Sequence, residues 1–276
     1  MIITQRNQEL KVCRAQREEK VLMVLEWLAE FRASNAQILA RRLAVAVSNC
    51  HKLLSDMTAA GLIHSFENSH TRGLRLFALG KLGIGRLEVW GRDTQTAIIK
   101  AHNLSRSTTV LHDLCVQSIG LQLMERFQCS EIHWDHNIKT ESKERPDLLL
   151  VRPDGFKAAV EFDRTAKSSS RFYERLIGNY ESISQGHYHA AITASESEAV
   201  LSRYQNLFSA PEWPVFRKNS AGKLIELSST ITPLPHITRE ISWLPARDLV
   251  SDIFSSRLRP QKIPHEDPRT LELQPH

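Results

Sequence analysis

Apolar positions in the first third of the chain repeat with helical spacing. Over residues 19–31 they recur every three or four residues, which predicts an amphipathic helix. Ser34 and Asn35 supply a cap signal for a short second helix. A third helix is expected over residues 47–57, with Gly61 placed to end it. Three short helices in succession therefore open the chain.

Shorter apolar runs, typical of strands, follow these helices. Residues 63–79 predict two strands around a polar tip at residues 68–73. Further along, helices are expected at 110–127, 168–183 and 196–208, and strands at 131–138, 148–151, 156–160 and 188–193. The order helix, three strands, helix, strand predicts a compact α/β core.

The C-terminal part carries weaker signals. Residues 224–227 are expected to form an edge strand, residues 243–254 a last helix, and residues 257–276 a polar, disordered tail. We therefore expect three parts: a first domain over residues 1–95, an α/β domain over 96–256, and the tail.

Composition narrows the class of protein. A chain of 276 residues that is 41% hydrophobic and 24% charged is expected to form one or two soluble domains. No apolar run reaches the roughly 18 residues that span a bilayer, and the N-terminus lacks the apolar region of a secretory signal. The four cysteines have no Cys-x-x-Cys spacing, which argues against a zinc finger or a disulfide framework. A cytoplasmic location is the expectation.

Charge is distributed unevenly along the chain. The first 100 residues hold 15 Lys and Arg against 9 Asp and Glu, whereas the remainder holds 21 against 22. A basic N-terminal third suits nucleic-acid phosphates, with binding that weakens as salt rises. Proteins that bind no DNA also carry a net charge of this size, so the charge alone does not identify the binding partner.

Three carboxylates are expected to meet at the ends of two predicted strands. Asp147 precedes the strand at 148–151, while Glu161 and Asp163 follow the strand at 156–160. Because successive side chains of a strand alternate between faces, Glu161 and Asp163 point the same way, and a hairpin brings both near Asp147. Such a cluster would hold Mg²⁺ or Mn²⁺ and leave room for phosphate and water. The alternative is that these acids pair with arginines on a solvated face.

The first third resembles the winged helix-turn-helix family over about residues 18–90. The resemblance rests on Val47-Ser48 at a helix start, Gly61-Leu62-Ile63 at its end, and Leu79-Gly80-Lys81-Leu82-Gly83 after the hairpin. In that family the third helix enters the major groove of double-stranded DNA and the hairpin contacts the backbone. The implied DNA-binding residues are Arg41, Arg42, Ser48, Asn49, His51, Lys52, Arg72 and Arg75. A winged helix that binds protein is the alternative.

The second part is similar to the mixed-sheet α/β core of PD-(D/E)XK nucleases. Pro146-Asp147 matches the first half of that motif and Glu161 the second. Asp163 stands where the motif has lysine, and Lys167 is the candidate replacement. Because of this departure, a nuclease-like core without catalytic activity is the alternative.

Both parts together resemble the replication-relaxation family, which includes the MobC-type relaxases of mobilisable plasmids. The resemblance spans about residues 18–195. It is carried by His112-x-Leu114, Arg145-Pro146-Asp147, Glu161-x-Asp163-Arg164-Thr165 and a basic helix with Tyr180. It implies binding to DNA near an origin of transfer or replication and, for the MobC-type members, strand cleavage at the origin of transfer. Relaxosome or coupling proteins are the implied partners.

A metal-dependent nicking mechanism follows as a hypothesis. Asp147, Glu161 and the carbonyl of Phe162 would hold Mg²⁺ or Mn²⁺, and Asp163 would complete the shell or orient the attacking water. The full set of catalytic candidates is Asp147, Glu161, Asp163, Lys167, His112 and Tyr180. Lys167, Arg164 or His112 would stabilise charge on the phosphate.

Two of these residues have ordinary alternatives. Tyr180 is the best placed covalent nucleophile, but packing in the core or stacking on DNA bases is the favoured explanation for it. His112 can be a satisfied histidine near a helix start. For the whole protein, the alternative to an enzyme is a DNA-binding regulator or accessory protein with an inactive nuclease-like core.

Overall fold

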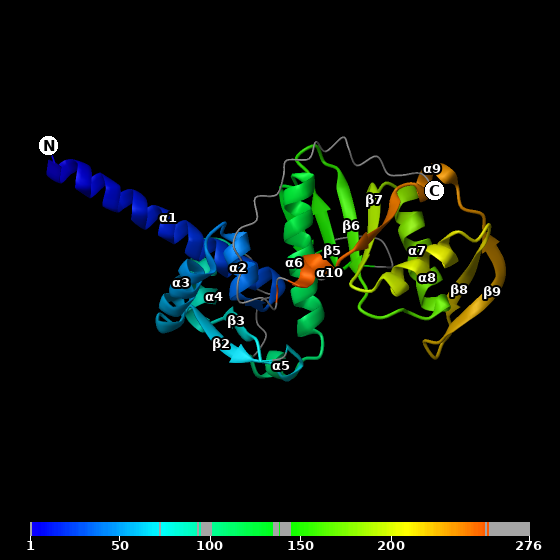
Figure 1. The fold of residues 1–276 in the computed structure, drawn as a ribbon, viewed down its shortest axis with the longest axis horizontal. Coiled ribbons are helices and arrows are strands. Elements are labelled where there is room, and N and C mark those ends of the chain that lie inside the picture. Colours follow the sequence, from blue (N-terminus) through cyan, green and yellow to red (C-terminus); the bar gives the residue numbers. More distant parts are fainter. Residues whose placement is uncertain are drawn as a thin grey trace. The chain divides into compact units, whose positions relative to one another are not determined.

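The structure is a computed structural model that describes residues 2–71, 73–92, 94, 101–134, 138, 145–251 and 253. The described residues form two compact units (Figure 1). The first holds those up to Gln117 together with Ile253, and the second holds those of Ser118–Ser251. The division lies inside helix α6 (Val110–Phe127), whereas the sequence prediction placed the boundary at residue 95. The predicted tail over residues 257–276 lies outside the described residues.

The first unit combines helices with a small antiparallel sheet. Its helices are α1 (Ile2–Phe31), α2 (Ala36–Arg42), α3 (Val47–Ala59), α4 (Lys81–Val89) and α5 (Ala101–Arg106). Its strands are β1 (Ser34–Asn35), β2 (Ile63–Glu67) and β3 (Arg75–Leu79), in the order β1-β3-β2, and a 3₁₀ turn (Ser69–Thr71) lies between β2 and β3. The predicted helices and hairpin are confirmed, while β1, α4 and α5 were not predicted.

Local chemistry explains where these helices begin and end. The side chain of Asn35 accepts a hydrogen bond from the backbone N–H of Ile38, which caps α2 as predicted. Gly61 has a φ of 69°, a conformation that suits glycine, and it ends the turn after α3. Helix α1 begins well before residue 19, and its side chains from Lys11 to Glu19 are exposed. Periodicity could not reveal the part from Lys11 to Glu19, because it has no buried face.

The second unit is built on a five-stranded mixed sheet with the order β10-β7-β6-β5-β4. Its strands are β4 (Glu131–Trp134), β5 (Leu148–Val151), β6 (Lys157–Phe162), β7 (Ala190–Ser195) and β10 (Ile241–Pro245). Its remaining elements are α7 (Ser169–Ser184), α8 (Glu198–Phe208), β8 (Trp213–Lys218), β9 (Leu224–Ile231), α9 (Pro235–Thr238) and α10 (Arg247–Ser251). Strands β4, β5 and β6 are antiparallel neighbours, whereas β6, β7 and β10 run parallel.

One predicted element of this unit is wrong. Residues 243–254 were expected to form a helix, but Trp243 lies in β10 and pairs with Thr193 of β7. Of the residues described in that range, Arg247–Ser251 are helical. A short apolar run such as Ile241–Pro245 suits a buried strand or a helix equally, so strand pairing decided its conformation.

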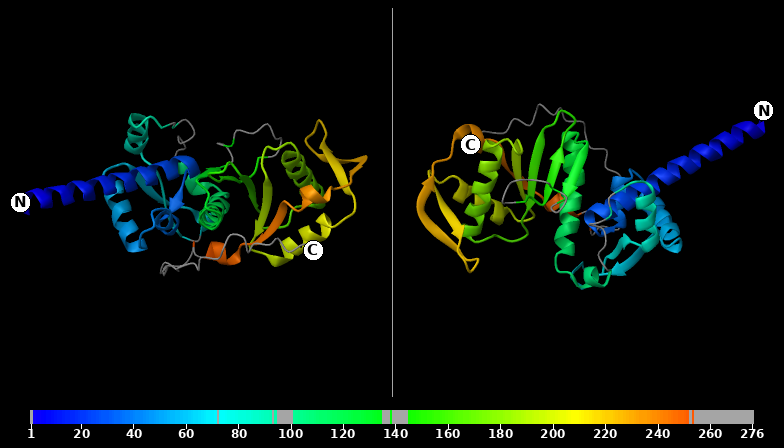
Figure 2. Two further views of the ribbon diagram at one scale, coloured as in Figure 1. Left: turned by 90° about the horizontal axis from the view of Figure 1, so that it is seen from above. Right: turned by 180° about the vertical axis from the view of Figure 1, so that it is seen from behind.

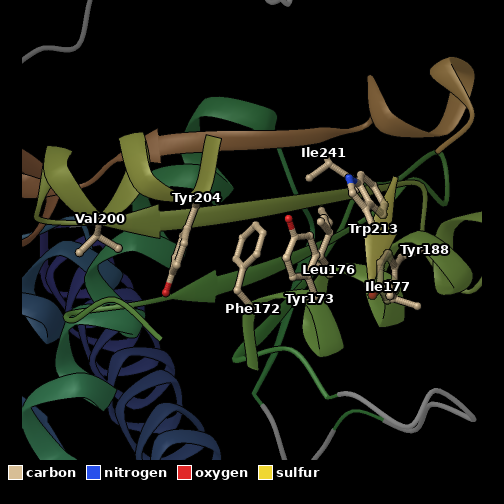
Figure 3. Close-up of a cluster of buried hydrophobic side chains, with 11 residues drawn as sticks. Phe172, Tyr173, Leu176, Ile177, Tyr188, Val200, Tyr204, Trp213 and Ile241 are labelled. Atoms are coloured by element: carbon tan, nitrogen blue, oxygen red, sulfur yellow. The ribbon is translucent and has the colours of Figure 1, made fainter. Parts of the chain in front are cut away.

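Helices cover both faces of the five-stranded sheet. The core on the α7 and α8 face includes Ala159, Phe172, Ala191 and Tyr204, and the rings of Phe172 and Tyr204 stack with centroids 4.6 Å apart (Figure 3). Helix α6 covers the other face, where Gly120 allows close approach to Ile132 and Leu148 (Figure 1). The β8–β9 hairpin packs against α7 on its side away from the sheet (Figure 2).

Candidate functional site

Strand geometry places the three predicted acids on the α7 face of the sheet. The β5–β6 ladder pairs Leu148 with Val160, and Asp147 and Glu161 are the next residues of their strands in the same direction. Because side chains alternate, Glu161 shares the face of Ala159, which belongs to the α7 core. The carboxylate Oδ2 of Asp147 accepts a hydrogen bond of 2.8 Å from the backbone N–H of Phe162. The predicted hairpin and the convergence of its acids are thus present.

Two basic side chains hold Asp163. Nη1 of Arg175 lies 2.6 Å from Oδ2 of Asp163, and Nζ of Lys167 lies 3.1 Å from Oδ1. The same Nη1 of Arg175 lies 3.6 Å from Oε2 of Glu161. Asp163, Glu161 and Arg175 are buried, whereas Lys167 is 38% exposed. The site is therefore a mixed cluster of acids and cations.

Arg175 was not among the predicted site residues, although the sequence contains a signal for it. It lies in α7 between Phe172 and Leu176, both of which are buried in the core. A charged residue on the apolar stripe of a helix is rarely buried unless it is paired, so its position indicates an acidic partner. Which acid it meets depends on the crossing of α7 over the sheet.

The pKa of Glu161 is raised to about 8, by burial first and by the carboxylate of Asp147 second, against the opposing effects of Arg175 and Lys167. Desolvation disfavours the charged form of an acid, and so does a second carboxylate nearby. Glu161 is therefore largely protonated at neutral pH. An additional cation beside Asp147 and Glu161 would favour its ionised form.

The predicted metal ligands fit a cation only in part. Among the described residues, no group of three or more His, Cys, Asp and Glu side chains is arranged to hold a metal ion. Asp163 is engaged by Arg175 and Lys167. Asp147 and Glu161 are two neighbouring carboxylates with hard oxygen donors, which is the chemistry that Mg²⁺ and Mn²⁺ prefer.

The other catalytic candidates lie in different surroundings. Tyr180 packs its ring edge against Trp213, and its hydroxyl accepts a hydrogen bond from the backbone N–H of Leu234. These are contacts of a packing residue. His112 lies in the part of α6 that belongs to the first unit, whereas the acids belong to the second. The backbone N–H of Lys167 donates to the hydroxyl of Tyr204, a buried residue that the sequence reasoning missed.

The predicted DNA-binding residues concentrate on α3 and the β2–β3 hairpin of the first unit. Four of them are exposed on α3: Ser48, Asn49, His51 and Lys52. Arg75 is also exposed and donates a hydrogen bond to Ser65. His51 and Arg75 line a hollow of about 300 Å³ together with Ser55 and Thr58, two polar residues that were not predicted.

The remaining basic residues of that prediction differ in how far they are buried. The guanidinium of Arg42 lies over the ring of Trp27, 5.6 Å from its centroid, and its Nε is buried. Arg41 is half-buried. Arg72 lies outside the described residues. Among the described residues of that prediction, the exposed ones therefore lie on α3 and at Arg75.

Comparison with known proteins identifies the chain at the level of a family. A family model described as Replication-relaxation matches residues 25–194, more than half of the chain, which agrees with the resemblance found in the sequence. No curated protein and no solved structure matches the chain significantly. None of the helices in the described part combines the length and apolar character needed to cross a membrane. The chain belongs to the Replication-relaxation family.

Proposed function

We propose that this protein binds double-stranded DNA at the origin of a plasmid or mobile element and nicks one strand there. Membership of the Replication-relaxation family suggests a role in plasmid replication or relaxation. The observation that carries the catalytic part is the convergence of Asp147 and Glu161 at the ends of adjacent strands. Relaxosome or coupling proteins are the partners that such a role implies.

The first unit supports DNA binding through its resemblance to a winged helix-turn-helix domain. Helices α2 and α3 are followed by the β2–β3 hairpin, and β1 completes the small sheet. Helix α3 presents Ser48, Asn49, His51 and Lys52 to solvent, as a helix that enters the major groove must. Arg75 on the hairpin suits a phosphate contact.

The second unit supports strand cleavage through its similarity to the PD-(D/E)XK core. Its order α6-β4-β5-β6-α7-β7, with three antiparallel strands and a parallel crossover, is the arrangement expected from that resemblance. Asp147 and Glu161 occupy the acidic positions of the motif. Asp163 departs from the motif lysine, and Lys167 brings an ammonium to its carboxylate.

The chemistry divides between the acids and the exposed lysine. Asp147 and Glu161 would hold Mg²⁺ or Mn²⁺, which when bound polarises a phosphoryl oxygen and lowers the pKa of a coordinated water. Asp163 fixes the ammonium of Lys167 at the rim of the cluster. Because Lys167 is partly exposed, its charge can reach a phosphate from this position and oppose the negative charge that develops there.

One observation favours a second candidate function. Arg175 already contacts Asp163 and Glu161, so part of the acidic charge is balanced without a metal. A protein with such a core could serve as a DNA-binding regulator or accessory protein that does not cut.

A nicking assay separates these functions. Supercoiled plasmid that carries the DNA flanking the protein's own reading frame is incubated with protein and Mg²⁺ or Mn²⁺. We expect the wild type to produce open circles and Asp147→Asn to lower the rate at least about 100-fold, because it removes a ligand charge from the metal site. Asp154→Asn is the matched control, since Asp154 is an exposed carboxylate in the turn of the same hairpin, and it should cut at the wild-type rate. Retarded but uncut DNA with the wild type would identify the accessory protein instead.

A salt titration tests the DNA-binding face. We expect Lys52→Ala to weaken DNA binding and to reduce the slope of log affinity against log salt by about 0.9, the value for one lost phosphate contact. Arg42→Met also removes one positive charge, but from a guanidinium that packs on Trp27. The slope of log affinity against log salt should therefore change less for Arg42→Met than for Lys52→Ala. Fluorescence anisotropy with a labelled duplex measures both. Equal slopes for Lys52→Ala and the wild type would exclude Lys52 as a phosphate contact.

A further inference from the structure

Arg175 is the buried cation of the acidic cluster. It comes from α7, it is only 5% exposed, and its Nη1 approaches both Asp163 and Glu161. Lys167 contacts the other oxygen of Asp163 but remains partly exposed, so water can replace it. Water cannot replace Arg175 in the same way, because Nη1 and Nη2 of its guanidinium are closed to solvent.

The guanidinium of Arg175 contacts an acidic side chain and an aromatic ring. Its Nη1 lies 2.6 Å from Oδ2 of Asp163, the distance of a close ion pair. The guanidinium also lies over the ring of Tyr204, 5.6 Å from its centroid. A buried guanidinium costs free energy unless it is paired, so its charge must be offset by Asp163, its close acidic partner.

A divalent cation at the acids would compete with this guanidinium. Any ion bound by Glu161 would lie close to Arg175, because Nη1 is already 3.6 Å from Oε2 of Glu161. Like charges at such distances repel strongly in a buried site. Asp163, held from both sides by basic groups, offers its oxygens to Arg175 and Lys167.

We propose that Arg175 is a built-in counter-cation that holds Asp163 and weakens metal binding at Asp147 and Glu161. In this role it is a positioning residue that sets the metal affinity of the cluster. The proposal rests on the proposed function in one respect, namely that the acids are the metal site. It predicts that the affinity for a divalent ion rises when the charge of Arg175 is removed.

Calorimetric titration with Mn²⁺ alone tests the proposal. The titration is made in air-free buffer at about pH 8.5, above the pKa of Glu161, to limit competition from protons. We expect Arg175→Met to bind Mn²⁺ at least tenfold more tightly than the wild type. Arg175→Lys keeps the charge and should stay within about threefold of the wild type. Lys167→Met removes an equal charge from the exposed side of Asp163 and should change the affinity much less, because solvent screens it.

Further variants connect the outcome to this site. The double variant Arg175→Met with Glu161→Gln should lose the gain in Mn²⁺ affinity that Arg175→Met shows alone. If Arg175→Met fails to fold by circular dichroism, Arg175→Gln removes the charge and keeps hydrogen-bond donors, with the same expected gain.

The possible outcomes separate the two proposals. Tight binding by the Arg175 variant with a silent wild type would support the counter-cation and remove support for a metal-dependent wild-type enzyme. Affinity that is equal, weaker or absent in a folded Arg175 variant would overturn the counter-cation, whether or not the wild type nicks DNA.

Discussion

Replacing Glu161 by glutamine is expected to stabilise the folded protein at neutral and alkaline pH. The pKa of Glu161 is raised from 4.5 to about 8 by burial first and by Asp147 second. In the unfolded chain the same carboxyl ionises freely at neutral pH, so folding must take up a proton there. That uptake costs on the order of 3 kcal/mol at pH 7, and glutamine does not incur it.

The direction of the pH dependence follows from proton binding. Between pH 4.5 and about 8 the folded state binds more protons at Glu161 than the unfolded state does. The contribution of this group to the free energy of unfolding therefore falls as pH rises through that range and levels off above it. Below pH 4.5 both states are protonated, so Glu161→Gln and the wild type should have similar stability there.

Urea unfolding at about pH 5 and pH 8, followed by circular dichroism, measures this difference. The free energy of unfolding of Glu161→Gln should exceed that of the wild type by more at pH 8 than at pH 5. Glu181→Gln is the control, because Glu181 is an exposed carboxylate of α7, and its effect should stay within about 0.5 kcal/mol. A constant difference between Glu161→Gln and the wild type at both pH values would contradict a raised pKa.

Replacing Gly83 by alanine is expected to destabilise the first unit by about 3 kcal/mol or more. A Cβ at Gly83 would lie 2.1 Å from the backbone oxygen of Leu62 and 3.0 Å from Cδ2 of Leu25. A backbone oxygen cannot move aside as a flexible side chain can, so α4 would have to shift away from its neighbours. Overpacking of this kind typically costs 1 to about 3 kcal/mol, and a clash with backbone belongs at the upper end.

Gly85 provides a matched control in the same helix. A Cβ at Gly85 would meet no atom within 4 Å. Alanine is the better helix former, so Gly85→Ala should stabilise α4 by roughly 0.5–1 kcal/mol. In thermal unfolding, the melting temperature of the first unit should therefore fall with Gly83→Ala and rise with Gly85→Ala. A shift of the same sign and size for both would mean that α4 does not pack against Leu62 as described.

Local sequence chemistry determined much of the fold. The hairpin of β5 and β6 was predicted from two apolar runs around a tight turn, and Gly155 in that turn has a φ of 82°. The cap of α2 at Asn35 and the end of α3 at Gly61 were likewise predicted from single residues. These features depend on neighbours within a few residues, so the sequence is sufficient to indicate them.

Tertiary contacts decided what local chemistry left open. The run Ile241–Pro245 became a strand because it pairs with β7, about 50 residues earlier in the chain. Side-chain alternation by itself predicted that Glu161 and Asp163 face the same way, with Asp147 nearby. The crossing of α7 over the sheet decided that the buried cation among them is Arg175. The strength of that buried pairing, and the raised pKa of Glu161, follow from the exclusion of water around atoms that are distant in sequence, which only the packed structure establishes.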